Sequence, residues 1–127
     1  MPLLNFTPQF VGPIRARTKQ QTIRASRKNP IEAGDRLFLY CGLRQPGAYR
    51  ILPEPVTCTR VEPISIGAAG HLIPGIVILG GNPLSDDERE ALAVADGFSG
   101  WPEMRDFFQD RLPFAGQIVY WAQGDSE

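Results

Sequence analysis

The sequence predicts one α+β domain in which five or six short strands form a small barrel flanked by short helices. The chain has 127 residues, enough for one hydrophobic core but too few for two domains. Its 12 prolines and 13 glycines indicate many short elements joined by tight turns, which is typical of a small barrel and not of a helical bundle. Strand patterns fill the middle of the chain, and the clearest helix signals come late. We therefore treat residues 1–127 as a single domain.

A short helix and a strand are expected in the first third of the chain. Thr7 followed by Pro8 marks a helix start, with threonine as N-cap and proline at the first helical position. Gly12-Pro13 keeps this helix short or breaks it. A turn over 30–35 then leads into a strand over 36–41, where small apolar residues alternate with larger or polar ones.

Further strands are expected in the middle of the chain. The segments 49–52, 56–66 and 72–79 are rich in β-branched and apolar residues, although prolines interrupt the last two. The single histidine, His71, falls in a turn-like stretch, and no catalytic role is expected for it.

The last third carries the helix signals. Ser85 and Glu88 have the spacing of a capping box, and Gly97 is a natural helix end. Pro102 is expected to begin a second helix, and the apolar run 116–121 a closing strand.

Charge is distributed unevenly along the chain. Residues 1–31 carry six basic side chains and no acid, whereas the rest carries seven basic side chains and all 14 acids. The six are Arg15, Arg17, Lys19, Arg24, Arg27 and Lys28. Such polarity indicates an anionic or polar ligand, for which a nucleotide or RNA is the natural candidate. A solvated basic arm explains the same pattern equally well.

The composition argues against several classes of protein. One histidine and two cysteines, Cys41 and Cys58, give neither a disulfide framework nor metal-ligand spacing. No apolar run is long enough for a membrane span, and the first residues lack the pattern of a signal peptide. We expect a cytoplasmic protein that needs no cofactor or metal and does not bind a membrane.

Lys19 and Thr22 are the candidate reactive pair. A threonine hydroxyl becomes a nucleophile when a neighbouring base takes its proton, and a lysine can be that base if burial or nearby cations lower its pKa. Spacing alone favours a plainer interpretation, in which Thr22 begins a strand and Lys19 is solvated.

Several motifs, in order, resemble the ASCH domain of the PUA-like superfamily. They are Lys19-Gln20-Gln21-Thr22-Ile23-Arg24, Ile31-Glu32-Ala33-Gly34-Asp35-Arg36-Leu37, Leu39-Tyr40, 92–98 with its Asp96-Gly97-Phe98 ending, Glu103-Met104, Phe107-Phe108, and 116–121. The similarity runs from about Phe6 to Trp121. It implies a small, partly open PUA-like β-barrel with a cleft beside the Thr-Ile-Arg segment.

The resemblance also implies an activity. Many members of the family are regarded as RNA-binding modules, some small bacterial members are amidohydrolases acting on N4-acetylcytidine, and ribonuclease activity has been attributed to others. In the amidohydrolases a lysine, a threonine and a glutamate are catalytic. Lys19 matches the lysine, Thr22 the nucleophile and Arg24 the arginine that follows it.

The acidic position departs from the family pattern. This chain has Asp96 where the amidohydrolases have glutamate, and the side chain is one methylene shorter. Glu90 is a weaker substitute earlier on the same predicted helix, and a solvated helix end is the plainer interpretation of Asp96. An acid at a helix C-terminus opposes the dipole, which slightly favours a functional role.

Four residues are candidates for substrate binding: Arg24, Tyr40, Arg44 and Phe98. Arg24 can bind a phosphate or polarise a carbonyl oxygen, or it can pair with a carboxylate such as Asp35 to hold the fold together. Tyr40 can stack on a base, and Arg44, in a loop bounded by glycine and proline, can clamp a phosphate. Phe98 can cap a base pocket, although such an aromatic residue is more often part of the core.

The leading hypothesis is therefore an amidohydrolase that deacylates an N4-acylated cytosine nucleoside through Thr22, Lys19 and Asp96. A non-catalytic RNA-binding module is the alternative, and a ribonuclease is a third possibility. The oligomeric state cannot be inferred from the sequence.

Overall fold

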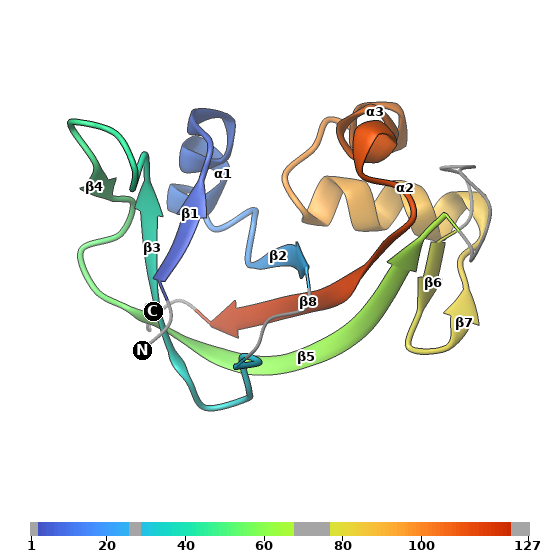
Figure 1. Cartoon of the computed structure of the whole chain (residues 1–127), viewed down its shortest axis with the longest axis horizontal. Coiled ribbons are helices and arrows are strands. Elements are labelled where there is room, and N and C mark those ends of the chain that lie inside the picture. The colour runs from blue at the N-terminus through green and yellow to red at the C-terminus, as the bar shows by residue number, and fades with distance from the viewer. Residues whose placement is uncertain (1–2, 26–28, 68–76, 123–127) are drawn as a thin grey trace.

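A computed structural model describes residues 3–25, 29–67 and 77–122. In these ranges the protein is a mixed α+β fold with an eight-stranded sheet, three short α-helices and two 3-10 turns (Figure 1). The strands are β1 (Leu3–Phe6), β2 (Gln21–Ala25), β3 (Arg36–Cys41), β4 (Tyr49–Arg50), β5 (Val56–Ile66), β6 (Val77–Leu79), β7 (Asn82–Pro83) and β8 (Phe114–Ala122). The helices are α1 (Val11–Arg15), α2 (Asp86–Ala95) and α3 (Trp101–Phe108), with η1 (Pro8–Phe10) before α1 and η2 (Gln109–Arg111) after α3.

The antiparallel pair of β5 and β8 forms the centre of the sheet. β2 adds to the free edge of β8, β6 and β3 pair with different parts of β5, and β1 lies parallel to β3. The strand pairs of the described ranges form an open, branched sheet, and the closed ring of a barrel is not observed.

A β-bulge bends the central pair. The register of β5 against β8 shifts between Cys58 and Arg60, so Thr59 has no opposite residue on β8. An extra residue of this kind increases the local twist and curves the strand. In Figure 1, β5 is correspondingly a long curved ribbon rather than a straight one.

The three helices lie on the same side of the curved β5–β8 pair (Figure 1). Seven ring contacts join phenylalanines and a tryptophan from β1, η1, the loop after α2, α3 and β8, with centroids 5.1–6.5 Å apart. Most are edge-to-face, the arrangement that the aromatic quadrupole favours. This aromatic layer connects η1, α3 and the loop after α2 to the sheet.

Most of the expected elements form. The helix start at Pro8, the strand over 36–41, the strand over 56–66, the capping box of Ser85 and Glu88, and the helix beginning beside Pro102 are all confirmed. The closing strand is also confirmed and is longer than expected, running over Phe114–Ala122.

Three differences have local causes. The predicted strand 49–52 contains only two paired residues, because β4 meets β3 just at Tyr40 and Cys41. β1 was not expected, since four residues are too few for a clear alternation; it forms by pairing with β3. Of the predicted strand 72–79, Val77–Leu79 is confirmed, whereas His71 and the rest lie outside the described residues.

Within the described part of the chain, no helix has the length and apolar character needed to cross a membrane.

Candidate active site

A cavity of about 430 Å³ opens between the sheet and the helices. Its walls come from β1, β2, η1, the end of α2, α3, η2 and the start of β8. Six phenylalanines make most of the apolar lining: Phe6, Phe10, Phe98, Phe107, Phe108 and Phe114. The polar lining comprises Asn5, Thr7, Lys19, Thr22, Arg24, Asp96 and Arg111. An apolar pocket with a few convergent polar groups is the usual form of a small-molecule site.

The end of α1 positions Lys19. Arg17 has a positive φ of 66°, and the backbone amides of Thr18 and Lys19 both donate to the carbonyl oxygen of Pro13, at 3.0 and 3.1 Å. This tight turn redirects the chain from the helix into β2. The Lys19 side chain is consequently directed into the fold and is only 1% exposed.

The end of α2 positions Asp96. This residue is the C-cap of the helix, and its side chain is also buried, with the whole residue 4% exposed. Gly97 follows with a φ of 99°, and a Cβ atom at that position would lie 2.9 Å from both Lys19 Cδ and a ring carbon of Phe10. Glycine is therefore required for two reasons, the backbone conformation and the close approach of Lys19.

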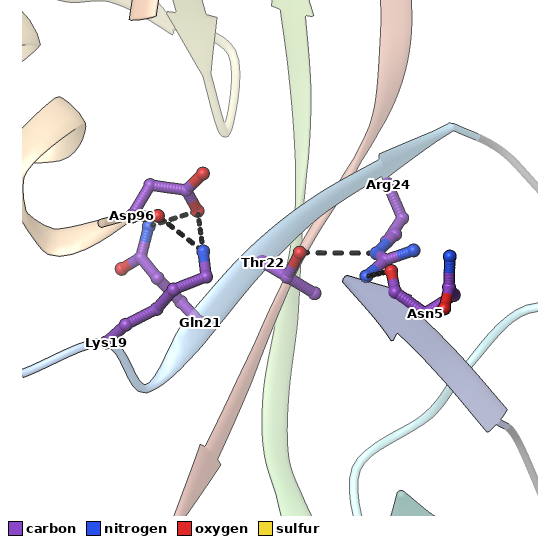
Figure 2. Close-up of polar contacts among 6 residues, drawn as sticks. All are labelled: Asn5, Lys19, Gln21, Thr22, Arg24 and Asp96. Atoms are coloured by element: carbon purple, nitrogen blue, oxygen red, sulfur yellow. Dashed lines mark hydrogen bonds and ion pairs between the residues drawn. The ribbon is translucent and has the colours of Figure 1, made fainter. Parts of the chain in front are cut away.

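Lys19 and Asp96 form a buried ion pair. The Lys19 ammonium donates to the backbone carbonyl oxygen of Asp96, and its Nζ lies 3.4 Å from Asp96 Oδ1 (Figure 2). Gln21 Nε2 lies 3.5 Å from the same carboxylate oxygen, a long contact at the limit of a hydrogen bond. A buried charge pair of this kind requires such additional polar partners, because both ions have lost their hydration.

Burial moves the two pKa values toward each other. Desolvation lowers the pKa of Lys19 from 10.5 to about 8, although the Asp96 carboxylate opposes this shift, and nearby Arg24 adds to it. Desolvation also raises the pKa of Asp96 from 3.8 to about 6, against the opposing effects of Lys19 and Gln21. Near neutral pH both groups can therefore exchange a proton at low cost, which is the property required of catalytic acids and bases.

Aromatic rings surround the ammonium group. Lys19 Nζ lies 4.6 Å from the centroid of Phe10 and 5.8 Å from that of Phe6. The ring faces attract the charged form of lysine and exclude water from it. Lys19 is thus held in a largely dry environment beside the cavity.

Thr22 and Arg24 form a second polar group on β2. Arg24 Nε donates to Thr22 Oγ1 at 3.2 Å, and Arg24 Nη2 donates to the backbone carbonyl oxygen of Asn5 at 2.7 Å. Figure 2 shows Thr22 between this guanidinium and the Lys19–Asp96 pair. Among the described residues, no hydrogen bond joins the Lys19 ammonium to the Thr22 hydroxyl.

The structure brings five of the seven predicted site residues to one cavity. Lys19, Thr22, Arg24, Asp96 and Phe98 all line it. Lys19 and Thr22 are buried, so the solvated lysine of the plainer interpretation is not observed.

Tyr40 and Arg44 do not line the cavity. The Tyr40 side chain alternates with the buried Leu39 and Cys41 of β3, and its hydroxyl accepts a hydrogen bond from Arg50 Nε at 3.2 Å. Strand alternation therefore places Tyr40 on the opposite side of β3 from the core. Arg44 lies in the exposed loop after β3.

Glu90 has a different position from Asp96. Glu90 Oε1 accepts a hydrogen bond from the backbone amide of Trp101 at 2.8 Å, which satisfies one of the free amides at the start of α3. It connects α2 to α3 and does not line the cavity. The acidic group of the site is Asp96.

Sequence reasoning missed several residues of the site. Phe6, Phe10 and Arg111 carry no motif signal, since their importance comes from contacts with residues distant in the chain. Gln21 stands within the 19–24 motif, but nothing in the motif indicates its contact with Asp96. Alternation along β2 could not have singled it out, because both Gln21 and Thr22 are buried.

Within the described ranges, no group of three or more histidine, cysteine or acidic side chains is arranged to hold a metal ion. Comparison with known proteins finds no matching family model, no matching curated protein and no matching solved structure.

Proposed function

We propose that the protein is an ASCH-type amidohydrolase that removes the acyl group from an N4-acylated cytosine nucleoside, and that its partly open sheet is a form of the PUA-like barrel. The observation that carries the proposal is the convergence of Lys19, Thr22 and Asp96 on one cavity. Lys19 and Asp96 also have shifted pKa values, which are enriched at catalytic sites.

Thr22 is the proposed nucleophile. Its Oγ1 accepts a hydrogen bond from the Arg24 guanidinium, which leaves the hydroxyl hydrogen available for transfer to a base. The positive charge of Arg24 also stabilises negative charge that develops on Oγ1 during attack on the acyl carbonyl carbon.

Lys19 is the proposed base, and it must be neutral to act. With a pKa of about 8, roughly a tenth of the lysine is neutral at pH 7. In the first step the neutral amine turns from Asp96 toward Thr22 and takes the hydroxyl proton as Oγ1 bonds to the acyl carbon. Catalytic hydrogen bonds often form only when substrate is bound, so the absence of a Lys19–Thr22 bond in the free protein is compatible with this step.

The second half of the reaction returns the proton. As the tetrahedral intermediate collapses, the carbon–nitrogen bond breaks, and the Lys19 ammonium donates its proton to the departing exocyclic nitrogen of the base. A water molecule then attacks the acyl carbon while Lys19 accepts its proton. The bond between the acyl carbon and Thr22 Oγ1 breaks, Lys19 returns the proton to Oγ1, and the carboxylic acid leaves. Asp96 holds the ammonium in place between these steps through its carboxylate and its carbonyl oxygen.

The apolar lining suits a pyrimidine base. Phe10, Phe98 and Phe107 pack edge-to-face or tilted in the cavity wall, with centroids 5.4–6.5 Å apart. Such surfaces pack favourably against nucleobases.

The test is loss of the N4-acetylcytidine chromophore, followed by ultraviolet absorbance. Thr22→Ala should lower kcat at least about 1,000-fold, because removal of a nucleophile abolishes the covalent route. Thr22→Ser should retain part of the activity. Thr57→Ala is the matched control, since Thr57 is an exposed β5 residue outside the cavity. Equal activity of Thr22→Ala and wild type would refute the proposed mechanism, and no turnover by wild type would refute the proposed activity.

Non-catalytic RNA binding is the second candidate. It is favoured by the hydrogen bonding of the Lys19 ammonium to Asp96 and not to Thr22, which is the arrangement of a structural ion pair. This candidate predicts no deacylation and an RNA affinity that falls steeply as the salt concentration rises.

A further inference from the structure

We propose that the end of the cavity far from Lys19 binds a phosphate ester, and that Arg111 is the residue that holds it. The substrate class would then be a cytosine nucleotide, free or within RNA, in place of an unphosphorylated nucleoside. The identity of the base rests on the proposed function, whereas the phosphate site rests on the contacts described below.

The cavity has two chemically different ends along β2. Gln21, at the start of β2, reaches toward Asp96 and so marks the end that holds the buried ion pair. Ala25, at the other end, pairs with Gly116 near the start of β8. Phe114 begins β8, and Arg111 precedes it by three residues. Arg111 and Ala25 therefore mark the same end, and β2 spans about 13 Å between the two ends at roughly 3.3 Å per residue.

Close approach of β2 and β8 shapes the second end. A Cβ atom at Gly116 would lie 2.0 Å from the carbonyl oxygen of Arg24, so only glycine allows this strand pairing. The pairing sets Arg24 opposite Gln117, beside Gly116.

Arg111 is oriented by an aromatic ring and not by an acid. Its guanidinium carbon lies 4.3 Å from the centroid of Phe107, and Nη1 donates to the Phe107 carbonyl oxygen. Arg111 makes no ion pair with a carboxylate of the described residues, including its neighbour Asp110. Arg60, Arg89 and Arg105, by contrast, each pair with an acid. A guanidinium has five N–H donors, so several of those on Arg111 remain for an incoming anion.

The charge of the cavity lining favours an anionic ligand. Its charged side chains are Lys19, Arg24, Arg111 and the single carboxylate of Asp96, which together carry a net charge of +2 when all are ionised. Asp96 and Lys19 compensate each other at one end. A phosphate ester near Arg111 would balance the excess positive charge at the other.

The test is calorimetric binding of three unacylated ligands: cytidine, cytidine 5′-monophosphate and the trinucleotide ApCpA. We expect wild type to bind cytidine 5′-monophosphate about 10- to 100-fold more tightly than cytidine, the range of a charge-assisted hydrogen bond. Arg111→Gln should abolish that ratio, and Arg111→Lys should keep most of it. Arg105→Gln is the matched control, because Arg105 is on α3 but does not line the cavity.

Each outcome has one meaning. Equal affinity of wild type for cytidine and its monophosphate, or a ratio that Arg111→Gln leaves unchanged, overturns the phosphate site while leaving the proposed function intact. Failure of all three ligands to bind overturns the cytosine pocket itself. Tighter binding of the trinucleotide than of the mononucleotide assigns the phosphate to RNA, and the reverse order assigns it to a free nucleotide.

Discussion

Replacement of Asp96 by asparagine tests the buried ion pair most directly. The substitution leaves the Lys19 ammonium without its anionic partner in a site that is 1% exposed. Breaking a buried pair in this way costs up to about 3–5 kcal/mol when the remaining ion stays charged. The cost has a ceiling, because the lysine can release its proton. At pH 7 that release costs the folded state only about 1 kcal/mol, because the folded-state pKa of Lys19 is already about 8, one unit above the pH.

The Asp96→Asn substitution should also change how the free energy of unfolding depends on pH. The folded-state pKa of Lys19 lies below its unfolded value, so the unfolded chain binds more protons between about pH 8 and 10.5, and wild-type stability rises with pH in that window. Without Asp96 the pKa of Lys19 falls further, and the rise begins at lower pH. The raised pKa of Asp96 has the opposite effect. Wild-type stability falls as pH rises from 3.8 to about 6, and the variant lacks this fall.

Urea unfolding at several pH values measures both effects. With a slope of about 1.5 kcal/mol per molar urea, Asp96→Asn should lower the midpoint at pH 7 by no more than about 1 M, because release of the Lys19 proton limits the loss. The double variant Lys19→Met/Asp96→Asn removes both charges and should recover wild-type stability or exceed it. A loss above about 3 kcal/mol for Asp96→Asn at pH 7, or a double variant no more stable than the single one, would refute the description of a desolvated lysine with a pKa of about 8.

Three further predictions concern the same site. If Lys19 is the base, kcat/KM for N4-acetylcytidine should rise about 10-fold per pH unit between pH 6 and 8 and level off above the pKa of about 8; a flat profile over that range would contradict the assignment. Gly97→Ala should destabilise the protein by about 1–3 kcal/mol in urea unfolding, and by more than Gly34→Ala. The two glycines have nearly the same φ, 99° at Gly97 and 96° at Gly34, but only a Cβ atom at Gly97 would meet Lys19 and Phe10. Equal losses of stability would therefore show that this contact is unimportant. Glu90→Gln weakens the contact between α2 and α3, so it should lower the free energy of unfolding by about 1 kcal/mol and leave hydrolysis intact. Asp96→Asn, by contrast, should abolish hydrolysis. The reverse pattern in the absorbance assay would transfer the acidic role to Glu90.

Much of the secondary structure could be predicted because its causes are local. The capping box of Ser85 and Glu88 satisfies two backbone amides within four residues of chain, so it can be read from spacing alone. The alternation in 36–41 likewise reflects one face packed in the core. The open, branched sheet differs from the expected barrel, because closure depends on which distant strands pair and not on any pattern within a strand.

The candidate site could be predicted only in part, and through motifs rather than chemistry. Lys19 and Thr22 stand out through the resemblance to the ASCH pattern, which remains a prediction. Tyr40 was placed near the site on the strength of its residue type, and strand alternation directs it elsewhere. Arg111 had no local signal, since its position beside the cavity depends on the packing of α3, whose Phe107 ring it contacts.

The sequence by itself determined the residue types available for chemistry, the glycine that permits the turn after Asp96, and most element boundaries. Only the tertiary structure decided that Lys19 and Asp96, 77 positions apart, meet in a buried contact. The physical reason is that a pKa depends on hydration and on neighbouring charges, both of which exist only once distant segments pack together. An ordinary lysine and an ordinary aspartate thereby become groups that can exchange protons near neutral pH.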